Sequence, residues 1–255
     1  MTSLPCASHG QSDPFASTHW SVIVAAGRSA SEPESARVAL GELCQTYWSP
    51  LYAFVRSRGY SMHDGQDLTQ SFFAHLIEHE TYARADRTRG KFRTFLLAAL
   101  KNFLADAYEH AHRLKRGGAQ DFLPLDGSRV EAAESLFQTR SAEQPDSEDR
   151  LFEQTWAEAL VGACLREIAK EYAADGKQAL FQELQVFLTG SAEPLPVYEE
   201  LALNTGLPAP TLRSHVTRLR ARYRELLRAA VRQTVETEAD VEEELHELFR
   251  VLTGR

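Results

Sequence analysis

Apolar side chains recur at helical spacing along most of this chain, and this periodicity constrains its fold more than any other feature. A stripe with the i, i+3/i+4, i+7 spacing runs from Leu40 to Val55, and further stripes follow in residues 62–80, 92–107 and 151–188. No segment shows the strict alternation of apolar and polar residues that is typical of a half-buried strand. The sequence therefore predicts an all-α fold.

The helical segments fall into two groups separated by a stretch of different composition. Residues 117–147 are rich in Gly, Ser, Asp, Glu and Gln and lack a sustained apolar stripe, which is typical of a linker. We expect two helical domains joined by a flexible acidic linker, the second containing a helix-turn-helix, plus a C-terminal acidic helix. The expected parts are an N-terminal extension at 1–35, a first domain at 36–118, a linker at 119–149, a second domain at 150–235 and a C-terminal extension at 236–255.

Charge is segregated along the chain, although the total is −8. Residues 84–116 carry nine basic against three acidic residues, and residues 209–232 carry seven against one, so that each segment has a net charge of +6. Acidic stretches lie between them, at 126–159, and after them, at 233–255. A single basic run is usually a solvated helix face, but two basic blocks with interleaved aromatic residues favour a nucleic-acid partner.

The second basic block contains the pattern of a helix-turn-helix at 197–224. Ala202 allows a close helix approach, and Gly206, four positions later, can adopt the left-handed turn conformation. The outward side chains near the start of the second helix would then meet base edges or phosphates in a major groove. These candidate contacts are Thr211, Arg213, Ser214, His215, Arg218 and Arg220. The alternative is an ordinary helical hairpin with a solvated arginine face.

The first basic block alternates basic and aromatic residues over 86–116, an arrangement that suits single-stranded or melting DNA. Most of its Phe residues lie on the apolar stripe and are expected in the core. The candidate DNA contacts are therefore Lys91, Arg93, Lys101, Asn102, Arg113, Lys115 and Arg116.

Other function classes find little support in the sequence. No apolar run approaches the roughly 20 residues of a membrane-spanning helix, and residues 1–20 lack a signal-peptide pattern, so we expect a cytoplasmic protein without membrane insertion. The three cysteines lack metal-ligand or disulfide spacing. The pair His63-Asp64 is similar to a phosphohydrolase metal dipeptide, but no partner set lies at ligand spacing. We expect no enzyme activity, no cofactor and no metal.

Three stretches together resemble a known family. They are 47–56 with 64–73, then 90–104 continuing to 115–118, and the helix-turn-helix pattern at 197–224. In this order they resemble RNA polymerase sigma factors of the sigma-70 family, extracytoplasmic-function subgroup. The resemblance implies that the first stretch binds core RNA polymerase, the second recognises and melts the minus-ten promoter element, and the third reads the minus-thirty-five element. It also implies no enzyme activity and no cofactor.

The resemblance assigns polymerase binding to a helix face with Asp64, Gln66, Asp67, Gln70 and Ser71. Two acids customary in the family are replaced here by Gln66 and Ser71. We therefore hypothesise that phosphorylation of Thr69 or Ser71 by a Ser/Thr kinase restores the missing charge, the alternative being a weakly binding, constitutive factor. An anti-sigma protein is a further partner left open. The competing interpretation of the whole chain is a helix-turn-helix transcriptional regulator of promoter DNA that acts without core polymerase.

The C-terminal extension combines an apolar helical stripe with seven acidic residues. The stripe consists of Val241, Leu245, Leu248, Phe249 and Leu252. We hypothesise that it docks on the second domain and brings carboxylates near Arg220, Arg224 and Arg228, where they compete with DNA phosphates. The alternative is a solvated helix that extends the domain or binds a partner.

Overall fold

The computed structural model describes residues 46–78, 91–113, 127–142, 147–189, 194–235 and 238–253. Within these ranges the regular structure is helical, without a strand, and the predicted all-α class is confirmed. The helices are residues 46–57, α3 (Met62–Glu78), α4 (Phe92–Arg113), α5 (Gly127–Ala142), α6 (Glu148–Ala174), α7 (Gln178–Leu184), α8 (Val186–Thr189), α9 (Tyr198–Thr205), α10 (Ala209–Arg232) and α11 (Glu238–Thr253).

Local side chains account for several helix ends. The Ser61 hydroxyl accepts a hydrogen bond from the Asp64 amide at 3.1 Å at the start of α3. Ser147 caps α6 in the same way by accepting from the Arg150 amide at 3.2 Å. Gly206 ends α9 with a left-handed φ of 70°, and its amide donates to the Ala202 carbonyl at 3.0 Å.

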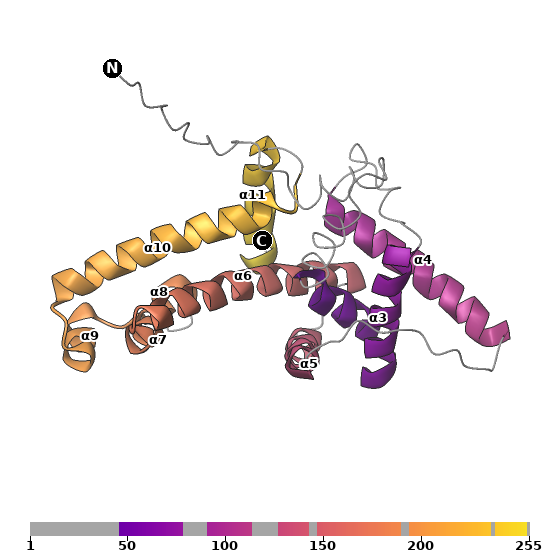
Figure 1. The fold of residues 1–255 in the computed structure, drawn as a ribbon, viewed down its shortest axis with the longest axis horizontal. Helices are drawn as coiled ribbons and strands as arrows, with labels where there is room; N and C mark the ends of the chain where they lie inside the picture. Colours follow the sequence, from indigo (N-terminus) through magenta and orange to yellow (C-terminus); the bar gives the residue numbers. More distant parts are fainter. Residues whose placement is uncertain are drawn as a thin grey trace, which may run out of the picture.

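Two long helices, α6 and α10, run side by side in opposite directions and form the axis of the molecule (Figure 1). At one end α7, α8 and α9 connect them, and at the other end lie α3, α4 and α5. The last helix, α11, crosses the C-terminal end of α10 and contacts both α10 and α6. The last helix of the chain therefore lies against both long helices.

The larger of two hydrophobic cores draws on every described helix except α7, α8 and α9. Its largest buried side chains come from helix 46–57, from α3, from α4 and from the first half of α6. The end of α10 contributes Leu227 and Val231, and α11 contributes Val241 and Leu248, both fully buried. The acidic C-terminal helix is thus part of the core.

The smaller core lies at the other end of the long helices. It joins Ile168 at the end of α6 to residues of α7, α8 and α9 and to the first half of α10. Tyr223 and Leu226 of α10 pack against both cores. The transition between the two cores therefore falls inside α6 and α10, which run through both of them.

The prediction of a flexible linker at 119–149 is wrong for residues 127–142, which form α5. One narrow face of α5 is buried, with Val130, Ala133 and Glu134, and the remaining positions are mostly polar and exposed. A helix that buries so few positions has the composition of a linker, which explains the incorrect prediction. Residues 119–126 and 143–146 lie outside the described part of the chain, as do the N-terminal extension at 1–35 and the first ten residues of the expected first domain.

None of the helices in the described ranges combines the length and the apolar character that crossing a membrane requires.

Candidate nucleic-acid interface

The α9–α10 pair is held together by apolar contacts below its short turn. Leu201 of α9 is buried with Leu212, Val216 and Leu219 of α10 in the smaller core. The rings of Phe187 and Tyr198 stack with centroids 5.2 Å apart and close the start of α9. The opposite side of α10 is left to its polar residues, which are exposed.

The arginines of α10 differ in what they contact. Arg222 pairs with Glu171 at 2.5 Å and with Glu225 at 3.3 Å, and Arg213 pairs with Glu199 at 3.3 Å. A second group makes hydrogen bonds only to backbone carbonyls, with no carboxylate at ion-pair distance in the described part of the chain. This group, called the arginine ridge below, consists of Arg218, Arg220 and Arg224.

The arginine ridge is exposed and carries uncompensated positive charge in the middle of α10. Of the side chains predicted to contact DNA here, Arg213, Ser214, Arg218 and Arg220 are exposed. Thr211 and His215 are half-buried. Burial, followed by the nearby charge of Arg218, lowers the pKa of His215 below its ordinary value. The lowered pKa favours the neutral imidazole, which can accept a hydrogen bond.

The basic residues at the start of α4 were predicted to be exposed to DNA, but the structure pairs them with acidic side chains. Arg93 is only 3 % exposed, and its guanidinium donates to Glu153 at 2.7 Å and pairs with Glu244 of α11. It also lies over the Trp156 ring, 4.3 Å from the centroid. Arg93 was expected to contact DNA, and in this conformation it cannot, because it is enclosed by carboxylates and aromatic surface.

Two further lysines expected to contact DNA are also paired. Lys91 contacts Glu244 at 2.7 Å, and Lys101 contacts Asp149 at 2.7 Å. Both partners come from segments that the sequence places far from α4. The side chain of Arg113 and the whole of Lys115 and Arg116 lie outside the described residues.

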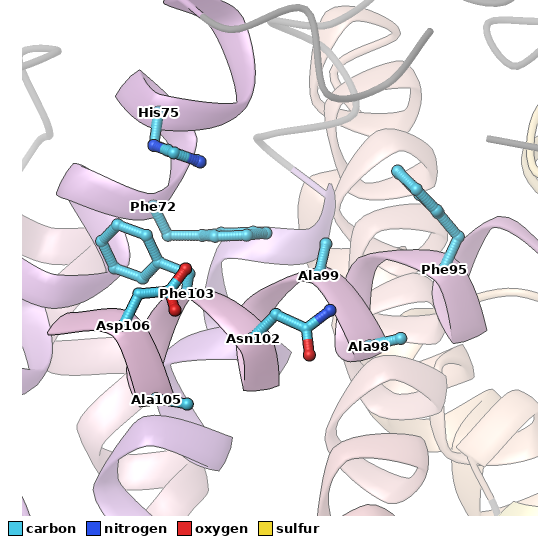
Figure 2. Close-up of a pocket in the computed structure, with 9 residues that line it drawn as sticks. All are labelled: Phe72, His75, Phe95, Ala98, Ala99, Asn102, Phe103, Ala105 and Asp106. Atoms are coloured by element: carbon cyan, nitrogen blue, oxygen red, sulfur yellow. The ribbon is translucent and has the colours of Figure 1, made fainter. Parts of the chain in front are cut away.

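Asn102 is exposed and lines a cavity of about 580 Å³ between α3 and α4. Figure 2 shows rings from both helices around it, with two polar side chains on the α4 side. The lining residues are Phe72, His75, Phe95, Ala98, Ala99, Asn102, Phe103, Ala105 and Asp106. Aromatic faces with amide and carboxylate groups can stack on and hydrogen-bond to a planar heterocycle.

The predicted polymerase-binding face of α3 is only partly accessible. Asp64 is exposed and accepts a hydrogen bond from the Ser61 hydroxyl at 2.7 Å, while Asp67 lies 2.9 Å from His63. Gln66 is half-buried, and Gln70 is buried. The accessible carboxylates of this face are therefore Asp64 and Asp67, and Asp67, whose side chain is 47 % exposed, already contacts His63.

The phosphorylation hypothesis is wrong for Thr69 in this conformation. Its side chain is fully buried, and its hydroxyl donates to the Gly65 carbonyl at 2.7 Å. A kinase needs an accessible hydroxyl, and the helix turns this one inward. Ser71 is half-buried and stays a prediction.

Sequence analysis missed a polar cluster that fixes α5. Glu134 is buried and contacts Arg56 and Tyr52 of helix 46–57. Phe137, one turn further along α5, lies under the Arg56 guanidinium at 4.9 Å from the ring centroid. The spacing of Val130, Ala133 and Phe137 is a short helical stripe that would have predicted α5.

In the part of the chain that the structure describes, His, Cys, Asp and Glu do not gather in groups of three or more that could hold a metal ion. Cys164 is a buried, unbridged thiol, and burial raises its pKa to about 11, so it is not a reactive thiolate at neutral pH. The candidate site chemistry is therefore cationic and aromatic.

Comparison with known proteins returned no match to a family model, to a curated protein or to a solved structure.

Proposed function

We propose that this protein is a sigma factor of the extracytoplasmic-function subgroup, which binds core RNA polymerase and directs it to promoter DNA. The observation that carries the proposal is the exposed arginine ridge in the middle of α10, the second helix of the α9–α10 pair. Exposed guanidinium groups without carboxylate partners, distributed around the accessible surface of one helix, suit the phosphate backbone, while Arg213 and Ser214 near the amino end suit base edges. The protein supplies recognition, and the polymerase supplies the chemistry.

The order of the sequence motifs adds support for the polymerase. The segments similar to the clamp-binding and minus-ten-binding parts of sigma factors fall on helix 46–57, α3 and α4, and the helix-turn-helix pattern falls on α9 and α10. The cavity beside Asn102 would suit an exposed base of a melted strand. A protein that only needed to bind duplex DNA would have no use for these N-terminal features.

A second candidate is a transcriptional regulator that binds promoter DNA without core polymerase. It is favoured by α3, on which Gln70 is buried and the carboxylate of Asp67 faces His63. A face with so little accessible negative charge would bind a basic polymerase surface weakly.

The two candidates are separated by one experiment on the full chain. Purified protein is mixed with core polymerase, and promoter-specific transcription and co-purification are measured, followed by sequencing of the bound DNA. The proposal expects a stable complex and transcripts that start at defined sites. DNA binding of equal strength and specificity with and without polymerase, and without transcripts, would support the regulator instead.

Two variants tie the result to the arginine ridge. Arg218→Ala is expected to reduce transcription, because it removes a cation that no described carboxylate compensates. Arg222→Ala removes the same charge from the same helix but at a position already paired with Glu171 and Glu225, and it serves as the matched control. If both variants behave alike, the ridge does not carry the function.

A further inference from the structure

Glu244 of α11 is a buried carboxylate shared by two basic residues, Lys91 just before α4 and Arg93 in its first turn. Its side chain is 2 % exposed, with one oxygen 2.7 Å from the Lys91 ammonium and the other paired with Arg93. These two cations stand at the start of α4, within the first basic segment, and both were predicted to contact DNA. A single acid of α11 therefore pairs with both cations.

This contact is part of an ionic cluster of four side chains, which come from the start of α4, from α6 and from α11. Glu153 of α6 holds the second side of the Arg93 guanidinium, which is stacked on Trp156. Lys91 and Arg93 thus face Glu153 and Glu244, two cations against two anions. Glu243 and Glu247 of α11 also act electrostatically on Lys91, so most of the negative charge around these cations belongs to α11.

The rest of α11 makes similar contacts with the second basic segment. Glu238 lies 2.7 Å from Arg228 and 2.9 Å from Arg232, and Glu242 also pairs with Arg228. On the same helix, the apolar side chains of Val241 and Leu248 enter the larger core. The helix therefore neutralises cations of both basic segments at once.

The cluster is a costly way to close an interface, because ionised groups lose hydration when they are buried. Burial and the adjacent Arg93 charge lower the pKa of Lys91, and burial raises the pKa of Glu153. In both residues the charged form is disfavoured despite the pairing. An interface of this kind is held less firmly than an apolar one of the same size, and a competing polyanion or salt weakens it further.

We propose that α11 is a latch that holds Lys91 and Arg93 in a closed conformation, and that nucleic-acid phosphates compete with Glu244 for these two cations. The latch rests on the proposed function, because it regulates access to the same DNA-binding residues. It acts on the first basic segment, whereas the arginine ridge on α10 stays exposed in the closed conformation. The protein would thus bind duplex DNA through α10 first and engage a melted strand only after α11 moves.

The test uses the full chain with Glu244→Gln, which keeps the side-chain shape and removes the charge. The probe is a fluorescently labelled, mixed-sequence single-stranded oligonucleotide, measured by anisotropy at low salt. Amide hydrogen exchange of residues 238–253 is measured on the same samples without DNA. Glu131→Gln is the matched control, because Glu131 is an exposed acid on α5 and the substitution removes the same charge.

Glu244→Gln is expected to tighten binding of the oligonucleotide about fivefold or more. Only the open fraction of the protein binds the oligonucleotide, and the substitution raises that fraction. Exchange in residues 238–253 is expected to speed up, and the control is expected to change neither quantity by more than about twofold, the effect of one remote charge. Adding Lys91→Gln to Glu244→Gln should remove most of the gain, because the gain comes from the released cation.

Other outcomes separate the latch from the proposed function. Faster exchange in α11 with unchanged oligonucleotide affinity would overturn the latch and leave α11 as a structural helix, while duplex binding through α10 still supported the proposed function. Absence of binding to any DNA, by the wild type and by the variant, would overturn both. If Glu244→Gln does not fold, Glu242→Gln at the exposed rim replaces it. A smaller gain in affinity is then expected, and the absence of any gain would contradict the latch.

Discussion

Arg56 and Glu134 form a bidentate ion pair across 78 positions of sequence. The Arg56 Nε donates to Oε2 at 2.9 Å and Nη2 donates to Oε1 at 2.7 Å. The Tyr52 hydroxyl adds a third donor to Oε2 at 2.5 Å. Together these bonds fasten α5 to helix 46–57, the segment similar to a polymerase-binding helix.

Glu134→Gln is expected to lower the free energy of unfolding by about 1–3 kcal/mol, because it removes the anion that pairs with a partly buried arginine and accepts further hydrogen bonds from Tyr52 and Gln138. Urea unfolding followed by circular dichroism measures the change. Glu131→Gln, on the exposed side of the same helix, is expected to stay within about 0.5 kcal/mol of the wild type. Equal stabilities of the two variants would contradict the assigned role of the pair.

The same pair predicts a pH dependence. Hydrogen bonds from Arg56, the largest cause, lower the pKa of Glu134 from 4.5 to about 2 in the folded protein. A carboxyl group with a lowered folded-state pKa stabilises the fold fully above pH 4.5, and its contribution is lost as the pH falls toward 2. The stability difference between wild type and Glu134→Gln should therefore be constant from pH 6 to 7 and shrink below about pH 4.5. A difference independent of pH would argue against ionised Glu134.

Substitution by alanine at two helix-interior glycines is expected to change the stability of the protein in opposite directions. At Gly65 in α3 a Cβ would lie 2.9 Å from Arg56 Cδ and 3.3 Å from Tyr52 Cε2, so Gly65→Ala should destabilise the protein by about 1–3 kcal/mol. At Gly162 in α6 the nearest atom is the flexible end of Arg166 at 3.2 Å. Gly162→Ala should therefore stabilise by about 0.5–1 kcal/mol, the usual gain in helix propensity. Thermal and urea unfolding of both variants decide the signs.

Salt dependence of duplex binding tests the arginine ridge. Each phosphate contact that is lost should reduce the slope of log K against log salt by about 1. Arg218→Ala and Arg224→Ala are each expected to show this reduction and to weaken binding at low salt. Arg222→Ala is expected to leave the slope nearly unchanged, because its guanidinium is held by Glu171 and Glu225. Identical slopes for all three variants would contradict an interface on this face.

Local patterns in the sequence predicted local structure well. The stripes along α3, α4, α6 and α10 mark buried faces, and Gly206 has the left-handed conformation that its position suggested. These features depend on residues within one or two turns of each other. Periodicity and turn chemistry are therefore enough to predict them.

Contacts between distant segments could not be predicted in this way. Arg93 was expected to be exposed because its sequence neighbours are basic, whereas Glu153 and Glu244 enclose it from α6 and α11. The C-terminal acids were expected near Arg220, Arg224 and Arg228. Of these, only Arg228 pairs with α11 in the described part of the chain, because α11 crosses the end of α10 and does not follow its length. Charge alone does not specify which cation an acid will reach.

Membership of α11 in the larger core bears on how the chain is made. Val241 and Leu248 pack in the same core as Tyr47 and Phe92, yet on a ribosome they emerge about 150 residues after Phe92. Until then Lys91 and Arg93 lack their carboxylate partner on α11, and the apolar surface beside them is uncovered. Helix 46–57 and α4 must therefore wait for the last part of the chain to be translated before their core is complete, and chaperones would have that interval in which to bind the growing polypeptide.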